Sequence, residues 1–440
     1  MAAVEQTFWK PATDGQCVWT RIAARWIVLP LLLASVVAST LSVRAQTRPQ
    51  NAKPYATLDR DTVAYRGPGR ESERGLPEGV AIIGLMLPLR GRQEAEGKAL
   101  AAAAELALEE EAATRFPDGR RLVLGTGDET GPWGQASSEI LKLIEEDHAL
   151  ALITSANGSI AHQAEQISNK LGVPILTLAS DATTTEINMP WLFRLGASDA
   201  DQARAFAQRI YQELDLKRVL LVSQGDHDGR TGAKEFMRAR ERLRVPQPDR
   251  LELSSVSPEL DGVEDQIRAA NPQAVVLWTD SKAGSMAVTL VREAAPGVPI
   301  FVCSRAAQLR FESGDEARGN APTNEVRATN GVWVVGSNPS LQNESRVFIE
   351  RYVARTGRAP SFAAFQVHDA VRMIAAALQA AGANRVRLRD ALASGATFQG
   401  LAGTYSFDPA GNLRQAFTLV RLPADAPTET GAENAQSGLR

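Results

Sequence analysis

The sequence predicts an α/β fold made of two similar lobes, each a parallel sheet flanked by helices, joined by a hinge. Short and continuously apolar runs recur between residues 80 and 422, and longer helical patterns separate them. Such apolar runs are typical of parallel strands that are covered on both faces. This many strand–helix units exceeds what one doubly wound sheet comfortably holds, so two lobes are the simplest packing. No long polar linker divides them, which predicts short crossings between the lobes.

The individual elements follow from these patterns. The predicted strands are the apolar runs 80–87, 122–125, 150–154, 175–178, 219–223, 274–278, 300–303 and 332–335. The predicted helices are 94–111, 135–146, 160–171, 199–214, 232–243, 263–270, 283–294, 344–356 and 364–381. Ser198 with Asp201 has the pattern of a capping box, and Gly172 and Gly382 stand where helices should end.

The two ends of the chain differ from this body. A basic flank, the apolar run 26–38 and a small-residue exit at 43–45 predict a cleavable signal peptide over 1–45. The alternative is a membrane anchor, for which the run is too short. The polar stretch 46–79 predicts a flexible tether, and 423–440 a disordered tail. We therefore expect a periplasmic protein.

Composition argues against several classes of protein. There are 48 Lys and Arg against 51 Asp and Glu, a net charge of −3, which gives no basic face for nucleic acid. Cys17 and Cys303 cannot build a disulfide framework. The four histidines lie far apart in the sequence, so we expect no metal and no cofactor. A Gly-x-Ser-x-Gly elbow does not occur, and the glycines of 125–131 do not fit a dinucleotide fingerprint, so we do not expect an enzyme.

Several segments in order resemble the type I periplasmic solute-binding proteins. The resemblance is to the leucine-binding-protein-like branch, the receptors for branched-chain amino acids and amides that serve ABC importers. It is carried by segments 83–91, 127–136, 153–159, 172–183, 193–202, 365–371 and 398–412. It implies a small-molecule ligand, closure of two lobes about a hinge, and delivery to an ABC permease in the inner membrane. We also expect a monomer.

The lobes are predicted to be discontinuous in sequence. Lobe 1 is expected from 80–198 plus 332–410, and lobe 2 from 199–331 plus 411–422. In parallel sheets, ligands bind beyond the carboxyl ends of the strands, so the ligand site is expected between the lobes.

The resemblance places Ser159, Asp181 and Thr183 on the first-lobe side of this site. Ser159 and Thr183 follow predicted strands near helix starts, where hydroxyl and backbone N–H groups can hold a carboxylate. Plain helix capping is the alternative for both. Glu96 could neutralise Arg305 or meet a cationic group of the ligand, and its alternative is an ordinary acid in the first turn of a helix.

The second-lobe residues depart from the family pattern. Asp228 stands where related receptors carry an aromatic residue, and Arg305 where they commonly carry a Glu that pairs with an ammonium group. An Arg there favours an organic acid over a simple amino acid, unless Arg305 is a solvated surface residue. Asp280 and Trp278 end a strand at the cleft edge, although Trp278 could equally belong to the core.

These patterns predict an extracytoplasmic solute-binding protein for an amino acid, an amide or an organic acid. The alternative is a sensor or envelope-enzyme regulator of the same fold that acts through a protein partner and does not transport. The predicted tether and the missing aromatic residue favour that alternative.

Overall fold

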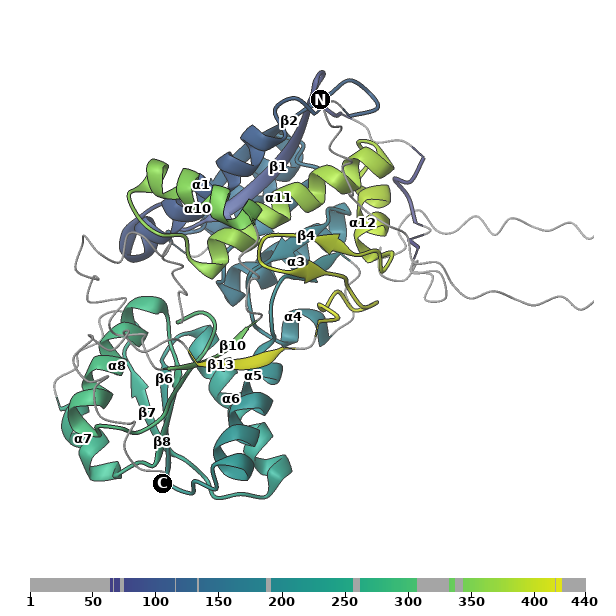
Figure 1. The fold of residues 1–440 in the computed structure, drawn as a ribbon. Helices are drawn as coiled ribbons and strands as arrows, with labels where there is room; N and C mark the ends of the chain where they lie inside the picture. The colour runs from purple at the N-terminus through teal and green to yellow at the C-terminus, as the bar shows by residue number, and fades with distance from the viewer. Residues whose placement is uncertain are drawn as a thin grey trace, which may run out of the picture.

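The computed structural model describes two lobes that lie one above the other in Figure 1. The described residues are 64–65, 67–71, 75–114, 116–132, 134–186, 191–255, 262–306, 332–336, 343–415 and 417–421. The predicted signal peptide and the predicted C-terminal tail lie outside them.

The first lobe is built on a parallel sheet with the strand order β2-β1-β3-β4-β5. Its strands are β1 (Val80–Leu87), β2 (Arg121–Asp128), β3 (Ala151–Thr154), β4 (Ile175–Thr177) and β5 (Leu192–Arg194). Its helices are a 3₁₀ turn (Gly91–Gln93), α1 (Glu94–Glu110), α2 (Gln135–Leu141) with a π-helical turn (Lys142–Glu146), α3 (Gly158–Leu171), α4 (Thr183–Glu186), α10 (Asn343–Thr356), α11 (Phe362–Ala381) and α12 (Arg385–Ala393). A two-stranded ribbon, β11 (Phe398–Gln399) and β12 (Thr404–Tyr405), also packs on this lobe.

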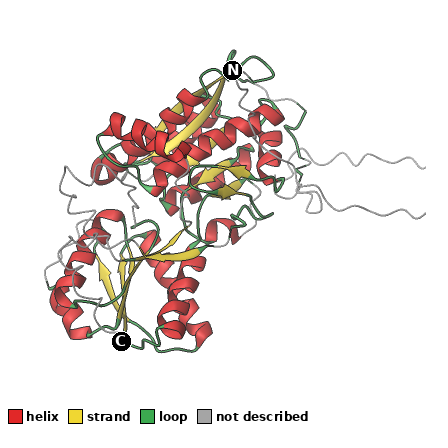
Figure 2. Ribbon diagram, in the orientation of Figure 1, coloured by secondary structure: helices red, strands yellow, loops and turns green. Residues whose placement is uncertain are grey.

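The second lobe is built on a sheet with the strand order β13-β10-β9-β8-β6-β7. Its strands are β6 (Val219–Gln224), β7 (Asp249–Leu253), β8 (Ala274–Trp278), β9 (Ile300–Val302), β10 (Trp333–Gly336) and β13 (Thr418–Arg421). Its helices are α5 (Asp199–Ala207) with a π-helical turn (Gln208–Glu213), α6 (His227–Leu243), α7 (Val263–Ala270) and α8 (Ser281–Ala294). All its strand pairs are parallel except β13 with β10. Figure 2 shows helices on both sides of these strands.

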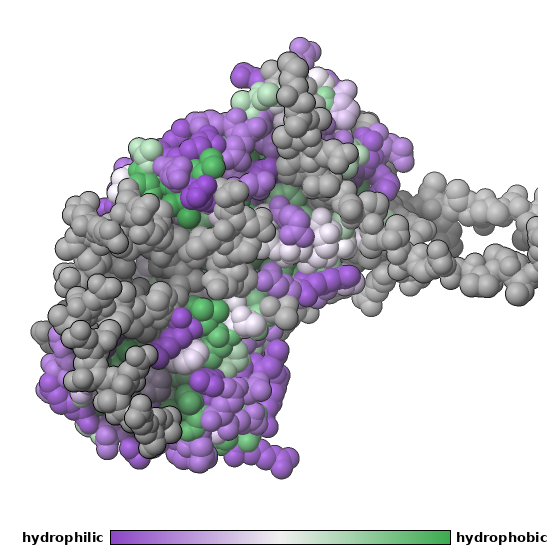
Figure 3. Space-filling view, in the orientation of Figure 1, coloured by the Kyte–Doolittle hydropathy of each residue, from purple (hydrophilic) through white to green (hydrophobic). Residues whose placement is uncertain are grey.

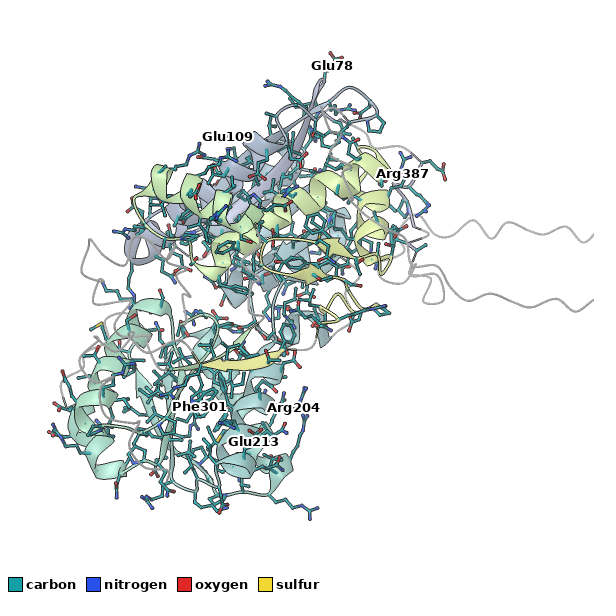
Figure 4. All side chains as sticks on the ribbon, viewed as in Figure 1. Glu78, Glu109, Arg204, Glu213, Phe301 and Arg387 are labelled. Carbon is teal, nitrogen blue, oxygen red and sulfur yellow. The ribbon has the colours of Figure 1, made fainter. Side chains whose placement is uncertain are left out.

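The predicted two-lobed α/β class is confirmed, and each lobe has its own apolar core. In the second lobe that core includes Phe301, which is fully buried and lies inside the lobe in Figure 4. Strand β7 escaped prediction because it lies at a sheet edge. Its residues Asp249, Arg250 and Glu252 are exposed, so it has no continuous apolar run.

Helix boundaries were set by capping side chains rather than by the first apolar residue. The predicted capping box of Ser198 and Asp201 is confirmed at the start of α5. Helices α3, α6, α8 and α11 begin two to five residues before their predicted starts. Each begins directly after a side chain that accepts a hydrogen bond from a first-turn N–H group. These caps are Asn157, Asp226, Asp280 and Ser361.

The predicted boundary of the lobes was wrong at residues 332–336. Strand β10 pairs with β9 and β13 and therefore belongs to the second sheet, not to the first lobe. The Trp333 ring stacks on Phe301, with ring centroids 6.2 Å apart, and the Arg209 guanidinium lies 4.8 Å from the Trp333 ring. Burial of Val334 and Val335 in the second core holds this strand in place.

Part of the predicted flexible tether is instead docked on the first lobe. The ring of Tyr65 is buried edge-on against Trp191, with centroids 5.1 Å apart. Its backbone N–H donates to Asp390 Oδ1 over 2.9 Å, and Arg70 forms an ion pair with the same carboxylate. The polar composition of this stretch gave no indication that the aromatic ring of Tyr65 fixes it to the lobe. Residues 46–63, 66 and 72–74 of the predicted tether lie outside the described residues.

Hydrophilic residues cover most of the described surface in the face that Figure 3 shows. Across the described ranges, no helix is both long and apolar enough to cross a membrane.

Candidate functional site

Polar contacts join the two lobes where the carboxyl ends of their parallel strands face each other. This is the edge at which ligands bind in open α/β sheets. The contacts use residues that follow β1, β3 and β4 in the first lobe and β6 and β8 in the second. Three groups of contacts are built from them, and each contains at least one predicted site residue.

The first group is centred on Asp280, which follows β8. Its Oδ1 accepts from the Ala283 N–H over 2.8 Å and so caps helix α8. Its Oδ2 accepts from Gln224 Nε2 over 3.1 Å and forms an ion pair with Arg92 of the first lobe. Asp280 therefore links a helix cap of the second lobe to a cation of the first.

The second group is centred on Asp228, in the first turn of α6. Its Oδ1 accepts from the backbone N–H of Gly158 over 3.0 Å, across the gap between the lobes. A Cβ atom on Gly158 would lie only 2.2 Å from that oxygen, so this approach requires glycine. Asp228 Oδ2 lies 3.6 Å from Arg305 Nη1, and Arg305 Nη2 donates to Asp226 Oδ2 over 2.5 Å.

Arg305 is thus a largely buried and paired cation, not the solvated surface residue of the alternative. Its side chain is 13% exposed. Burial works against its charge, but Asp228 and Asp226 raise the pKa of its guanidinium above the ordinary value. Burial raises the pKa of Asp228, although Arg305 opposes it. Burial would also raise the pKa of Asp226, but the hydrogen bond and charge of Arg305 hold it below its ordinary value.

The third group is centred on Asp181 and contains two histidines that were not predicted to be site residues. His162 Nε2 of α3 lies 3.0 Å from Asp181 Oδ2, and His227 Nε2 of α6 lies 2.7 Å from the same oxygen. The two imidazole rings meet edge to face, with centroids 5.6 Å apart. The distance between these histidines along the sequence gave no sign of this contact, because it forms between the two lobes.

The charges of this third group depend on one another. The hydrogen bonds of Asp181 and then of Glu165 raise the pKa of His162 to about 9. The hydrogen bond of Asp181 also raises the pKa of His227. Burial would raise the pKa of Asp181, but its bonds to His162, His227 and Thr183 lower it well below the ordinary value.

Thr183 and Asp181 form the start of α4. The N–H and hydroxyl of Thr183 both donate to Asp181 Oδ1, over 2.9 and 2.7 Å, and its hydroxyl oxygen lies 2.9 Å from His162 Nε2. The backbone carbonyl of Asp181 accepts from Arg194 Nη2 over 2.7 Å and from the Thr184 hydroxyl over 2.8 Å.

Ser159 lies in the first turn of α3, next to Gly158. Asn157, not Ser159, caps this helix, because its Oδ1 accepts from the N–H of Ser159 over 3.1 Å. Ser159 is half-buried at the same interlobe edge as Asp228. Its contact with a ligand stays a prediction, as does that of Thr183.

A pocket lies beside the crossing segments that connect the lobes. Glu96 of the first lobe and Arg305 of the second both line it, with Ser304 and Gln366. The other lining residues are mostly small or apolar: Ala156, Leu178, Leu195, Gly196, Ala197, Val335, Gly336, Ser361, Phe362, Ala363, Ala402, Tyr405, Leu413, Gln415 and Phe417. Ser159, Asp181, Thr183, Asp228 and Asp280 are not part of this lining and lie at the contacts described above.

Trp278 belongs to the core rather than to the pocket wall. It is 2% exposed and packs on Phe206, with ring centroids 5.6 Å apart. Its indole Nε1 donates to Asp199 Oδ1 over 3.1 Å. Burial raises the pKa of Asp199 to about 7, although its bonds to Ser180 and Trp278 oppose this.

A second buried acid, Glu129, lies near the cleft. Its Oε1 accepts from the Ser155 hydroxyl over 2.8 Å. Burial, followed by the charge of Glu96, raises its pKa to about 8 despite that hydrogen bond.

The sequence contained a signal for only some of the site residues that were not predicted. The run Asp226-His227-Asp228 directly after a strand, for example, concentrates ionisable groups at one sheet edge.

Comparison with known proteins gives consistent results. A family model described as "Periplasmic binding protein" matches residues 82–427. A curated protein of Pseudomonas aeruginosa described as an amino acid binding protein is 22% identical over 313 residues, which cover 69% of this chain and 79% of that protein.

Solved structures agree with this fold. A leucine binding protein from Thermotoga maritima has a TM-score of 0.66 at 18% identity, covering 78% of this chain and 96% of its own. A solute binding protein of an ABC transporter from R. palustris, in complex with benzoate, has a TM-score of 0.67 at 22% identity, covering 78% and 93%.

Proposed function

The chain belongs to the periplasmic binding protein family, and we propose that it captures a small carboxylate between its lobes and delivers it to an ABC importer. Solute capture is the activity of this family, whose members lie outside the cytoplasm and serve transporters. The identity of the solute and the residues that hold it are the proposal. The pocket that Glu96 and Arg305 line together supports it most directly.

The chemistry of the lining favours an organic acid with an apolar body. Arg305 is the cation of this lining, and a guanidinium can hold a carboxylate through two parallel hydrogen bonds. Leu178, Leu195 and Phe362 offer apolar surface to the rest of the solute. Glu96 decides whether an amino group is also accepted, since a carboxylate attracts an ammonium group.

Related proteins bind solutes of both kinds. One solved relative is a leucine binding protein and another holds benzoate. The pairing of Arg305 with Asp226 and Asp228 keeps it in place, because Asp226 accepts from Nη1 over 3.3 Å and from Nη2 over 2.5 Å, and Asp228 Oδ2 lies 3.6 Å from Nη1. We therefore place organic acids first, and amino acids and amides after them.

A thermal-shift series with four probes tests the solute class. Leucine, isocaproate and leucinamide share one apolar body and differ only in the ammonium or the carboxylate group, and benzoate adds an aromatic acid. A ligand that binds only the folded state raises the melting temperature according to its concentration over Kd. We expect isocaproate and benzoate to stabilise the protein more than leucine, and leucinamide not at all. Stabilisation by leucinamide alone would contradict a carboxylate site.

Variants of Arg305 identify the residue. Arg305→Lys keeps the charge, so Asp226 and Asp228 stay paired, but it removes the planar fork. We expect a melting temperature close to the parent's and a Kd for the best carboxylate at least about tenfold weaker, equivalent to about 1.4 kcal/mol. Arg204→Gln is the control, because Arg204 is exposed on α5 and does not line the pocket; Figure 4 shows it at the edge of the second lobe. An unchanged Kd in Arg305→Lys would place Arg305 outside the site.

One observation favours a second candidate, a sensor or regulator of envelope enzymes that acts through a protein partner. The lobes are already linked directly by Arg92 with Asp280 and by Gly158 with Asp228. A protein whose lobes close without a solute could present a fixed surface to a partner. No response to any solute in a broad screen, together with a partner recovered by crosslinking in the envelope, would support this candidate.

For the solute-binding function, we further propose that the protein is a monomer, catalyses no reaction, and is secreted with removal of residues 1–45. Burial raises the pKa of the Cys303 thiol to about 12, so this cysteine is a poor nucleophile. Amino-terminal sequencing of the protein from the periplasm tests the cleavage site, and sedimentation tests the monomer.

A further inference from the structure

The strongest unassigned feature is the cluster of His162, Asp181 and His227. His162 of α3 and Asp181, which follows β4, come from the first lobe, and His227 comes from α6 of the second lobe. Ligand-forming atoms of all three lie within 4.8 Å of one another. Neither the lining of the solute pocket nor the ion pairs of Arg305 include these three side chains.

We propose that this cluster is a divalent transition-metal site, suited to zinc, that ties the two lobes together. The ligand atoms would be His162 Nε2, His227 Nε2 and Asp181 Oδ2. Two imidazole nitrogens with one carboxylate oxygen is a common zinc donor set, and it leaves a fourth position open. Imidazole ligands favour zinc, copper and nickel over magnesium and calcium, which prefer all-oxygen sites.

The distances in the cluster are close to what one ion needs. Bonds of about 2 Å in a tetrahedral site put neighbouring ligand atoms roughly 3.3 Å apart. Asp181 Oδ2 is 3.0 Å from His162 Nε2 and 2.7 Å from His227 Nε2. Movements of a few tenths of an ångström would bring these two distances to that value, and the two imidazole nitrogens lie within 4.8 Å of each other.

A neighbouring carboxylate supports a metal at this position. Glu165 is 1% exposed, and its Oε2 lies 3.4 Å from Nδ1 of His162, on the side of the ring opposite to Asp181. Histidines that bind metal commonly donate their second N–H group to a carboxylate, which orients the ring and strengthens the ligand. The hydroxyl of Thr183, 2.9 Å from His162 Nε2, adds a polar group on the metal side.

The consequence would be metal-dependent closure. An ion held by side chains of both lobes binds the closed form and not the open one, so it stabilises closure by mass action. This inference does not depend on the identity of the solute, because the site uses none of the pocket residues. It can be tested without any solute.

Calorimetric titration of the chelator-treated full chain with ZnCl₂ tests the site, with MgCl₂ as the comparison. We expect one zinc per chain and no heat from magnesium. His227→Asn should weaken zinc binding more than about tenfold, and Glu165→Gln by about 10- to 100-fold, as for other residues that orient a ligand. His148→Asn is the matched control, because His148 has a positive φ that Asn tolerates and is not part of the cluster.

X-ray scattering with and without zinc tests the link between the lobes. We expect zinc to reduce the radius of gyration of the parent and of His148→Asn but not that of His227→Asn. Absence of stoichiometric zinc binding would overturn the proposal and leave the cluster as a hydrogen-bonded contact only. Zinc binding that survives His227→Asn but not His162→Asn would place the ion within one lobe and overturn the bridge.

Discussion

Gly158→Ala tests the closure of the two lobes with a single methyl group. In the closed structure that methyl carbon would lie 2.2 Å from Asp228 Oδ1 and 3.1 Å from Asp181 Cβ. Real Cβ atoms essentially never come closer than 3.0 Å to another atom, so the Asp228 carboxylate must move away by at least 3.0 − 2.2 = 0.8 Å, by rotation of its side chain or by widening of the gap between the lobes. Either movement lengthens the 3.0 Å hydrogen bond from the Gly158 N–H to Asp228.

The energetic cost can be worked from that bond. A hydrogen bond to a carboxylate contributes about 1.5–3 kcal/mol, so its loss shifts the equilibrium toward the open form by roughly 10- to 150-fold. Within the first lobe, only Asp181 Cβ has to move, by a few tenths of an ångström. Gly158 is the first residue of α3, with Asn157 as its cap, and alanine is a better helix former than glycine.

The assay is X-ray scattering of the solute-free protein, with thermal unfolding as the control for folding. We expect a larger radius of gyration for Gly158→Ala and a melting temperature no lower than the parent's by more than a few degrees. Asp228→Asn is the matched variant, because it keeps the acceptor oxygen and adds no atom at the contact. A scattering curve identical to the parent's would refute the reasoning, since it would mean that the lobes do not close through this contact.

Three further predictions concern stability. Burial raises the pKa of Asp199 to about 7, so between about pH 4 and pH 7 its carboxyl keeps a proton in the folded state that the unfolded state has lost. Stability should therefore fall as pH rises through this window, and Asp199→Asn, which keeps the acceptor for Trp278, should flatten the profile of melting temperature against pH; an unchanged slope would contradict the assignment. Phe301→Ala empties a fully buried position and should cost about 3–5 kcal/mol in urea unfolding, whereas a loss below 1 kcal/mol would mean that the second core is not packed as described. Tyr65→Ala should release residues 64–71 from Trp191 and make them sensitive to limited proteolysis; equal resistance in both proteins would show that Tyr65 is not the anchor.

Prediction from sequence was most accurate for features that depend only on residues within a single helix or strand. Continuous apolar runs located the central strands, and Ser198 with Asp201 located the start of α5, because both signals act within a few residues. It failed where a long-range contact overrides composition. Tyr65 is anchored by Trp191, and β10 joins the second sheet through Phe301 and its neighbours.

The candidate site shows the same division. The sequence indicated Asp228, Asp280 and Arg305 as ionisable groups at strand ends, and the structure brings all three to the edge between the lobes. It could not show that Arg305 is paired with Asp226, because that pairing depends on the geometry of two separate loops.

By itself, the sequence determined the class of the fold and the edge at which a solute would bind, since apolar periodicity and strand–helix alternation are local properties of the chain. Only the tertiary structure decided which charges meet across that edge. His162 and His227 share one oxygen of Asp181 because closure of the two lobes places α3 against α6. The spacing of residues along the chain does not encode the distance between the facing surfaces of two lobes.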